Sequence, residues 1–257
     1  MKSAQRRNAI VDVLMANGSA SVDELADRLM VSRMTIYRDL DQLEAHGLLR
    51  KVRGGASVHP SNRFESSFRY RSRLNEAAKR AIVAAARELV EPGQAILIDD
   101  GSTAGMLAEQ LREQRSLTVI TNNLQAIQYL ADIEGIELIV LGGSANSQFN
   151  GCFGMLTEQA LASIRADIAF MSPSTICDGA AYHQNQEVAK TKKAMMAAAE
   201  QRYLLADSSK FGRTALYLLS SLSAFDEIIT DREPDPRQRA AIDKLPVTLR
   251  VVGSGES

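Results

Sequence analysis

The sequence of 257 residues has no long apolar run, and this excludes several classes of protein at once. Crossing a bilayer takes roughly 20 consecutive apolar residues, and no segment approaches that length. Asp12 interrupts the apolar stretch near the N-terminus, so this segment does not have the pattern of a secretory signal peptide. We therefore expect a cytoplasmic protein with no membrane partner.

Cysteine is also scarce, and the sequence has neither internal repeats nor low-complexity segments. Its two cysteines, Cys152 and Cys177, do not form a C-x-x-C pair, so we expect no disulfide framework and no metal site. We predict no cofactor either. With 45% hydrophobic and 24% charged residues, the composition excludes a disordered, collagen-like or coiled-coil chain.

The net charge of −1 conceals an asymmetry along the chain. Residues 1–80 contain fifteen Lys and Arg against nine Asp and Glu, whereas residues 81–257 contain fifteen against twenty-two. A basic front part followed by an acidic remainder predicts a polyanionic partner for the front part only. The length favours two domains or one large α/β unit.

Three short helices are predicted near the N-terminus. Apolar residues recur at helical spacing over residues 3–17, and Ser21 and Glu24 have the spacing of a capping box that begins a second helix. Ser32 is in position to cap the third helix after a turn of about two residues. So short a turn is typical of a helix-turn-helix motif, whose third helix lies in the major groove of DNA.

The third helix is followed by a basic hairpin. Residues 48–59 read as two short strands joined at Gly54-Gly55, and three helices with such a hairpin form a winged helix. The helix would contact phosphates and base edges and the wing would contact flanking phosphates, although a basic helix face is often only solvated. The candidate DNA-binding residues are Ser32, Arg33, Met34, Thr35, Tyr37 and Arg38 on the helix, and Arg50, Lys51 and Arg53 on the wing.

The segment SVDELADRLMVSRMTIYRDLDQLEAHGLLRKVRGGA resembles the DNA-binding segment of the DeoR family of bacterial transcription regulators. Its most specific elements are Val31-Ser32, the TIYRDL run at 35–40 and the RGGA wing at 53–56. The family usually has arginine at the position of Tyr37, and a phenol lacks the bidentate fork, so the preferred operator base is expected to differ. The resemblance implies double-stranded operator DNA as a partner.

Residues 60–74 show neither helical nor alternating apolar order, and they interleave arginines with aromatic residues. We interpret them as a linker whose aromatic side chains dock on a neighbouring domain, with stacking on nucleic-acid bases as the alternative. The predicted organisation is therefore a winged helix-turn-helix domain at 1–59, a linker at 60–74 and a larger domain at 75–257.

Beyond the linker, short apolar strands alternate with helices. This pattern predicts a mainly parallel α/β sheet covered by helices on both sides, with ligands bound outside the carboxyl ends of the strands. The strands are expected at 95–99, 117–121, 136–141, 167–171, 203–207, 227–231 and 248–252, and the helices near 75–90, 103–113, 123–132, 185–200 and 235–244.

Polar turns follow several of these strands. In the turn DDGST at 99–103 a glycine and two hydroxyls open a helix, which is how backbone N–H groups and a helix dipole hold a phosphate, although such a turn is also an ordinary cap. Together the turns suit a phosphorylated polyol, with Lys210 as a point charge unless it is a surface lysine. The candidate effector-binding residues are Asp99, Gly101, Ser102, Thr103, Thr121, Asn122, Gly142, Gly143, His183 and Lys210.

Residues 75–252 also resemble the effector domain of the DeoR family, whose fold is similar to that of ribose-5-phosphate isomerase and its relatives. The resemblance implies a phosphorylated sugar as the effector. Residues 144–150 and 171–176 depart from the family pattern near the expected ligand rim. These departures leave the identity of the effector open but not its class.

Two functions follow. The first is a transcription regulator, most often a repressor in this family, whose affinity for the operator of a carbohydrate-catabolism operon is controlled by a phosphorylated sugar or sugar acid. The alternative is a sugar-phosphate isomerase with an accessory DNA-binding module. An isomerase needs a positioned base, for which Asp99, Asp178, His183 and Glu187 are candidates.

The lysine- and glycine-rich active-site run of the isomerases is missing, so we predict no catalytic residues and no enzyme. An RNA-binding winged helix is supported only by the basic linker. Because one winged helix meets too few phosphates and bases for specific affinity, we expect a homodimer or homotetramer. The effector, the operator sequence and the sign of regulation do not follow from the sequence.

Overall fold

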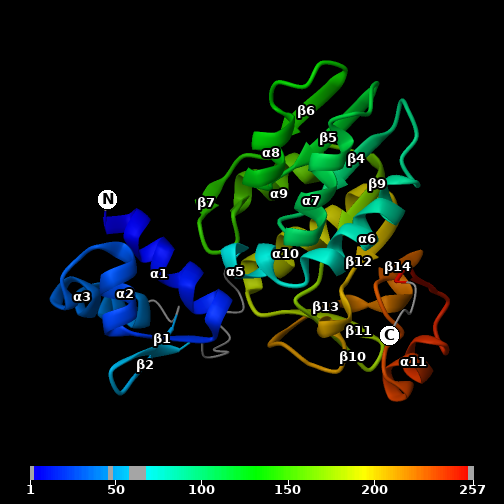
Figure 1. The fold of residues 1–257 in the computed structure, drawn as a ribbon. Helices are drawn as coiled ribbons and strands as arrows, with labels where there is room; N and C mark the ends of the chain where they lie inside the picture. Colours follow the sequence, from blue (N-terminus) through cyan, green and yellow to red (C-terminus); the bar gives the residue numbers. More distant parts are fainter. Residues whose placement is uncertain (1–2, 46–48, 58–67, 254–257) are drawn as a thin grey trace. The chain divides into compact units, whose positions relative to one another are not determined.

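The computed structural model describes residues 3–45, 49–57 and 68–253 (Figure 1). The chain forms two compact units, Met1–Arg71 and Ser72–Ser257, which we call the N-terminal and C-terminal units. Among the described residues, no helix is both long enough and apolar enough to cross a membrane.

The N-terminal unit is a winged helix, as predicted. Its elements are α1 (Ser3–Asn17), β1 (Ser19–Ser21), α2 (Val22–Leu29), α3 (Arg33–Ala45), β2 (Arg50–Val52) and β3 (Gly55–Ser57). The three strands form an antiparallel sheet in the order β1-β3-β2. Each helix buries one apolar stripe in a shared core, to which Ile10, Leu25 and Leu40 contribute fully buried side chains.

Both predicted helix caps are confirmed. The Ser21 hydroxyl accepts a hydrogen bond from the Glu24 amide at 3.1 Å, and the Ser32 hydroxyl accepts one from the Thr35 amide at 3.2 Å. Between the two helices, Met30 adopts a left-handed conformation with φ of 51° and ends α2. The caps and this residue together produce the tight turn of the helix-turn-helix motif.

The wing differs from the prediction by one residue. Its turn is formed by Arg53 and Gly54, not by Gly54 and Gly55, because Gly55 already pairs within β3. A Cβ atom at Gly55 would lie 2.3 Å from the carbonyl oxygen of Ala20, which belongs to β1. The first glycine thus supplies a positive φ of 80° and the second allows β1 to approach, although β1 itself was not predicted.

The prediction of a linker without helical order is partly wrong. Residues 58–67 lie outside the described part of the chain, but Phe68–Arg73 form the helix α5. The guanidinium of Arg71 lies 5.8 Å from the centre of the Phe68 ring, one helical turn away. This cation–π pair favours helix in a segment that has no apolar periodicity, which explains why periodicity did not reveal it.

The C-terminal unit is built on a seven-stranded sheet in the order β15-β14-β12-β9-β4-β5-β6, and every neighbouring pair is parallel. All seven predicted strands are confirmed. They are β4 (Ala95–Ile98), β5 (Leu117–Thr121), β6 (Ile136–Val140), β9 (Ala166–Met171), β12 (Ala199–Leu205), β14 (Glu227–Thr230) and β15 (Thr248–Val251).

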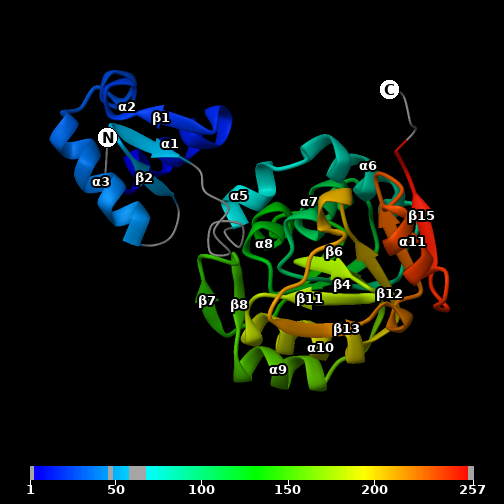
Figure 2. The same cartoon turned by 90° about the horizontal axis from the view of Figure 1, so that it is seen from below.

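Helices cover both faces of this sheet (Figure 2). Along β4, Ile96 and Ile98 point into the core beneath α6 (Glu76–Arg87), α7 (Ser102–Leu111) and α8 (Leu124–Leu130). Leu97 points into the opposite core, beneath α9 (Met155–Ala162), α10 (Gln186–Ala198) and α11 (Pro236–Ile242). The central strand is therefore apolar on both faces, as parallel sheets require.

The smaller elements of the C-terminal unit were not predicted. They are the hairpin of β7 (Ser144–Asn146) and β8 (Gly151–Phe153), the helix α9, and an antiparallel sheet of β10 (Thr175–Cys177), β11 (Ala180–His183) and β13 (Tyr217–Ser221). Two 3₁₀ turns, η1 (Ser208–Lys210) and η2 (Leu222–Ala224), complete the unit.

The strand order reverses next to β4. From β4 the chain proceeds through β5 to β6 at one edge, and then returns to place β9 on the other side of β4. In open parallel sheets this reversal leaves a crevice at the carboxyl ends of the two flanking strands, where ligands bind. The fold therefore directs attention to the residues that follow Ile98 and Met171.

Candidate functional site

The N-terminal unit presents most of its candidate residues to solvent. Arg33, Met34, Tyr37 and Arg38 are exposed on α3, and Arg50 and Arg53 are exposed on the wing. Ser32 and Thr35 are partly occupied with each other, since their hydroxyl oxygens lie 2.9 Å apart at the start of the helix. The exposed set places side chains for phosphate and base-edge contacts on α3 and on the neighbouring wing.

Two of these basic side chains already have acidic neighbours. The Arg33 guanidinium lies 2.5 Å from the Asp23 carboxylate, and Lys51 Nζ lies 2.5 Å from Asp41. Lys51 also donates its backbone amide to Glu44. The hydrogen bond to Asp41 raises the pKa of Lys51. Arg50 and Arg53 are therefore better placed than Lys51 to reach a phosphate.

The orientation of α3 depends on a residue that sequence reasoning missed. Asp39 is buried on the inner face of α3, and Arg6 of α1 donates to both of its carboxylate oxygens, at 2.5 Å and 3.3 Å. This bidentate pair fixes the recognition helix against α1. The signal was available, because an aspartate stands beside Leu40 on an apolar stripe.

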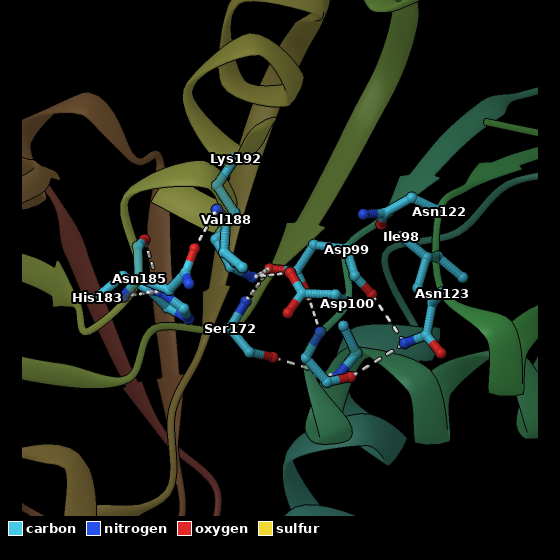
Figure 3. A network of polar contacts seen from close by, with 12 residues as sticks. Ile98, Asp99, Asp100, Asn122, Asn123, Ser172, His183, Asn185, Val188 and Lys192 are labelled. Carbon is cyan, nitrogen blue, oxygen red and sulfur yellow. Dashed lines mark hydrogen bonds and ion pairs between the residues drawn. The ribbon is translucent and has the colours of Figure 1, made fainter. Parts of the chain in front are cut away.

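In the C-terminal unit, Asp99 links the turns that follow β4 and β9 (Figure 3). One carboxylate oxygen of Asp99 accepts from the Gly101 amide at 2.8 Å, and the other accepts from the Ser172 amide at 2.7 Å. Lys192 of α10 pairs with the same carboxylate and lies 2.8 Å from that of Asp100. Asp99 thus joins the two turns at the crevice and belongs to its framework.

All three charged side chains of this network are almost fully buried, with exposed fractions of 1%. Burial raises the pKa of Asp99, and Lys192 only partly opposes this shift. Burial alone would lower the pKa of Lys192, but the carboxylates of Asp100 and Asp99 outweigh it and raise the pKa above its ordinary value. Lys192 is therefore a buried cation matched by two buried carboxylates.

The first turn of α7 contacts the turn that follows β9. Its Ala104 amide donates to the Ser172 hydroxyl at 3.2 Å, and its Gly105 amide donates to the Gly101 carbonyl at 2.8 Å. Ser102 and Thr103 are the first two residues of α7, so their amides have no acceptor within the helix. The first turn of a helix is in general an anion-binding arrangement.

Gly101 begins α7 and cannot be replaced without displacing its neighbours. A Cβ atom there would lie 2.3 Å from the Ser172 Cβ and 2.8 Å from an Asp99 carboxylate oxygen. The glycine is therefore required by the close approach of β9, whereas the sequence suggested that it frees the backbone for a ligand.

A second lysine reaches this turn from α6. Lys79 has an exposed fraction of 1%, and its Nζ donates to the Ser102 hydroxyl at 3.2 Å. Sequence reasoning missed it and proposed Lys210 instead. The signal was a lysine in the buried stripe of α6, one turn before Ile82 and Val83.

The turn after β5 supports the same crevice. Thr121 donates its hydroxyl to the Ile98 carbonyl at 2.7 Å, and the side chain of Asn123 donates to the Asp99 carbonyl at 2.9 Å. Asn122 donates to the Cys152 carbonyl at 2.9 Å, while its own side-chain oxygen is buried without a partner in the described part of the chain. Thr121 and Asn122 therefore connect β4, β5 and the β7–β8 hairpin.

The remaining candidates lie away from the α7 turn. Gly143, with φ of 130°, packs where a Cβ atom would lie 2.5 Å from the Phe153 carbonyl and from the Thr157 hydroxyl, and Gly142 accepts from that hydroxyl. His183 is buried; its Nδ1 accepts from the Asn185 amide at 3.1 Å and its ring lies 5.5 Å from that of Phe149. Lys210 is half-buried on the η1 turn after β12.

Both units of the chain match known protein-family models. Residues 6–62 match the DeoR-like helix-turn-helix domain, and residues 74–232 match the DeoR C terminal sensor domain. The chain belongs to the DeoR family. The resemblance seen in the sequence is thereby confirmed, and the C-terminal unit is a DeoR sensor domain.

The DeoR relatives of this chain include regulators of carbohydrate genes. The putative aga operon transcriptional repressor of Escherichia coli O157:H7 is 31% identical, over 98% of this chain and 94% of that protein. The glycerol-3-phosphate regulon repressor of E. coli K12 is 31% identical, over 91% and 93%. The L-fucose operon activator of Haemophilus influenzae is 35% identical, over 91% and 94%.

Among solved structures, ribose 5-phosphate isomerase A from Neisseria gonorrhoeae aligns with 52% of this chain and 52% of its own, at 17% identity and a TM-score of 0.38. We draw no argument from this partial overlap. The α/β class of this DeoR sensor domain is shown by its own parallel sheet.

Proposed function

We propose that the chain is a DNA-binding repressor of a carbohydrate-catabolism operon, and that a phosphorylated sugar or sugar acid controls its affinity for the operator. The observation that carries the proposal is the α7 turn, where the Lys79 ammonium contacts the Ser102 hydroxyl at the start of the helix. The names of two relatives, the putative aga operon repressor and the glycerol-3-phosphate regulon repressor, support this direction of regulation.

In this proposal residues 1–59 bind the operator and residues 75–257 sense the effector, with α5 replacing part of an unstructured linker. The protein acts as a homo-oligomer in the cytoplasm, because an operator of two half-sites needs two winged helices. Arg33, Met34, Thr35, Tyr37 and Arg38 with Ser32 read the groove. Arg50, Arg53 and, less directly, Lys51 contact phosphates.

We also propose that the sensor domain has no isomerase activity. The Asp99 carboxylate is engaged by two amides and Lys192, so it is not a base held ready for a substrate proton. His183 Nδ1 is occupied by the Asn185 amide. The alternative of an enzyme with an accessory DNA-binding module is therefore not favoured by either residue.

The DNA contact predicts an electrostatic signature. Arg50→Ala should weaken operator and random DNA alike, and should lower the slope of log affinity against log salt by about one unit, as loss of one phosphate contact does. Fluorescence anisotropy titrations at several salt concentrations measure this slope. Arg112→Ala, an exposed arginine of the sensor domain, is the control. An unchanged slope in Arg50→Ala would remove the wing from the interface.

The sensor predicts selective stabilisation by phosphorylated ligands. In a thermal-shift screen of the full chain, a phosphorylated sugar should raise the Tm and its unphosphorylated parent should not. Binding to the native state adds about 2.7 kcal/mol of stability when the ligand concentration is 100 times its Kd. Equal shifts with both members of each pair would show that the site does not recognise phosphate.

A further inference from the structure

The outward face of α3 carries apolar side chains beside its charged ones. Among the described residues of the N-terminal unit, the exposed large apolar side chains are Met30, Met34, Tyr37 and Val52. Met34 and Tyr37 have exposed fractions of 62% and 42%, and a spacing of three residues makes them neighbours on the surface of α3. Neither belongs to the core of the unit, so their apolar atoms are open to a partner.

The rotation of α3 about its own axis is fixed by the opposite face. Ile36 and Leu40 are fully buried in the core, and Asp39 between them is held by both hydrogen bonds from Arg6. Successive residues of an α-helix are turned by about 100°, so Met34 is directed away from this buried face. Tyr37 flanks it. The two side chains therefore meet whatever contacts the first two turns of the helix.

The polar side chains around them are directed at other groups of the protein. The Arg33 guanidinium pairs with Asp23 of α2, and the Ser32 and Thr35 hydroxyls lie within hydrogen-bonding distance of each other. Arg38 is exposed and adds a cation to the same face, which suits the phosphates that flank a base. In the free protein, the first two turns of α3 thus present a thioether and a phenol ring toward the position of the bases.

The major groove offers one apolar group to such a surface. Adenine, guanine and cytosine show hydrogen-bond donors and acceptors there, and thymine alone adds a C5-methyl group. Methionine has a flexible, polarizable side chain that fills an irregular gap, and tyrosine combines an apolar ring with a polar tip. A thymine methyl group is therefore the base feature that both side chains can bury.

We propose that Met34 and Tyr37 read thymine methyl groups in the operator, so that each half-site has thymine at positions facing the first two turns of α3. The proposal rests on the DNA-binding function proposed above and adds the chemistry of the bases that are read. Recognition at these positions depends on van der Waals contact with a methyl group. An arginine at position 37 would instead form a bidentate hydrogen bond with guanine.

Replacement of thymine by deoxyuridine tests this directly, because it removes the methyl group and leaves the base pair intact. Duplexes that the full chain selects from a random pool give the preferred sequence, and deoxyuridine is then placed at each recurrent thymine in turn. Wild-type protein should lose affinity about fourfold at one or more positions, the effect of one buried methyl group. Met34→Ala should bind the thymine and deoxyuridine duplexes equally at one of these positions. Fluorescence anisotropy measures both affinities.

Matched variants separate loss of a contact from other effects. Tyr37→Phe keeps the ring and should keep the sensitivity to deoxyuridine, whereas Tyr37→Ala should lose it at a different thymine from Met34→Ala. Met155→Ala removes an equally exposed methionine at the start of α9 in the sensor domain, and it should behave as wild type. A change in the stiffness of the DNA would lower affinity for every variant alike, so a sensitivity that disappears in Met34→Ala reports the contact itself.

The outcomes distinguish this proposal from the function on which it rests. A selected sequence whose thymines all tolerate deoxyuridine would overturn the reading of methyl groups and leave operator binding in place. Sensitivity that persists in both Met34→Ala and Tyr37→Ala would overturn the assignment to these residues. Selection without any preferred sequence would refute operator recognition, and the reading of thymine with it.

Discussion

Replacement of Lys192 by methionine is expected to lower the free energy of unfolding of the sensor domain by about 3–5 kcal/mol. The substitution conserves length but leaves the buried carboxylates of Asp99 and Asp100 without their cation. Lys193→Met, at the adjacent exposed position, should change the free energy by less than about 0.5 kcal/mol. Urea titration followed by circular dichroism measures both.

The pH dependence should identify the cause. Because the folded-state pKa of Asp99 is raised, the folded chain binds protons more readily than the unfolded chain just above the ordinary pKa of 3.8. Stability therefore rises as pH falls toward that value, and the loss in Lys192→Met should shrink on acidification. Asp100→Asn added to Lys192→Met should recover part of the loss. A deficit independent of pH would point to lost packing instead of unpaired charge.

Gly55→Ala is expected to disrupt the DNA-binding unit, whereas Gly54→Ala is tolerated. At Gly55 the new Cβ would meet the Ala20 carbonyl oxygen at 2.3 Å and the Ser21 Cα at 2.9 Å, both backbone atoms of β1. Overpacking of this kind costs about 1–3 kcal/mol or more, which is much of the stability of so small a unit. At Gly54 there is open space, and only the positive φ is strained, at roughly 1–2 kcal/mol.

Hydrogen exchange of α1 and α3 reports on this unit without interference from the sensor domain. Exchange there should accelerate strongly in Gly55→Ala, and operator affinity should fall because the wing loses its place beside β1. In Gly54→Ala operator affinity should stay near wild type, and exchange should accelerate less than in Gly55→Ala. Equal effects of the two substitutions would show that the approach of β1 to β3 does not limit the wing.

The sequence predicted those parts of the fold that local rules determine. Ser21 and Ser32 mark helix starts because a hydroxyl cap acts within three residues, and the seven strands are continuous apolar segments such as 95–98. The strand β1 was not predicted, because its three residues have small side chains and are too few to show an alternating apolar pattern. The helix α5 was not predicted, because it contains an aromatic–arginine pair and no apolar stripe.

The sequence predicted where the candidate site lies, but it did not predict the roles of the individual residues. The turn after β4 was found because its residues are consecutive in the chain. The roles depend on contacts between residues that are distant in the sequence. Asp99 contacts Ser172, 73 positions away, and Lys192, 93 positions away. Its structural role therefore cannot be recognised from the neighbouring sequence. Lys79 and Lys192 share one readable feature, a cation in the buried stripe of a helix, and that pattern could have identified both.

The pairing of β4 with β9 has a consequence for the protein during its synthesis. The winged helix is complete once the first 57 residues have been made, and N-terminal domains generally fold first on the ribosome. The crevice requires Ser172 and Lys192, so it forms only after more than a hundred further residues have emerged. A chain whose synthesis stops in that interval has the DNA-binding surface but no sensor domain. Control of operator binding by an effector therefore requires the intact C-terminal unit.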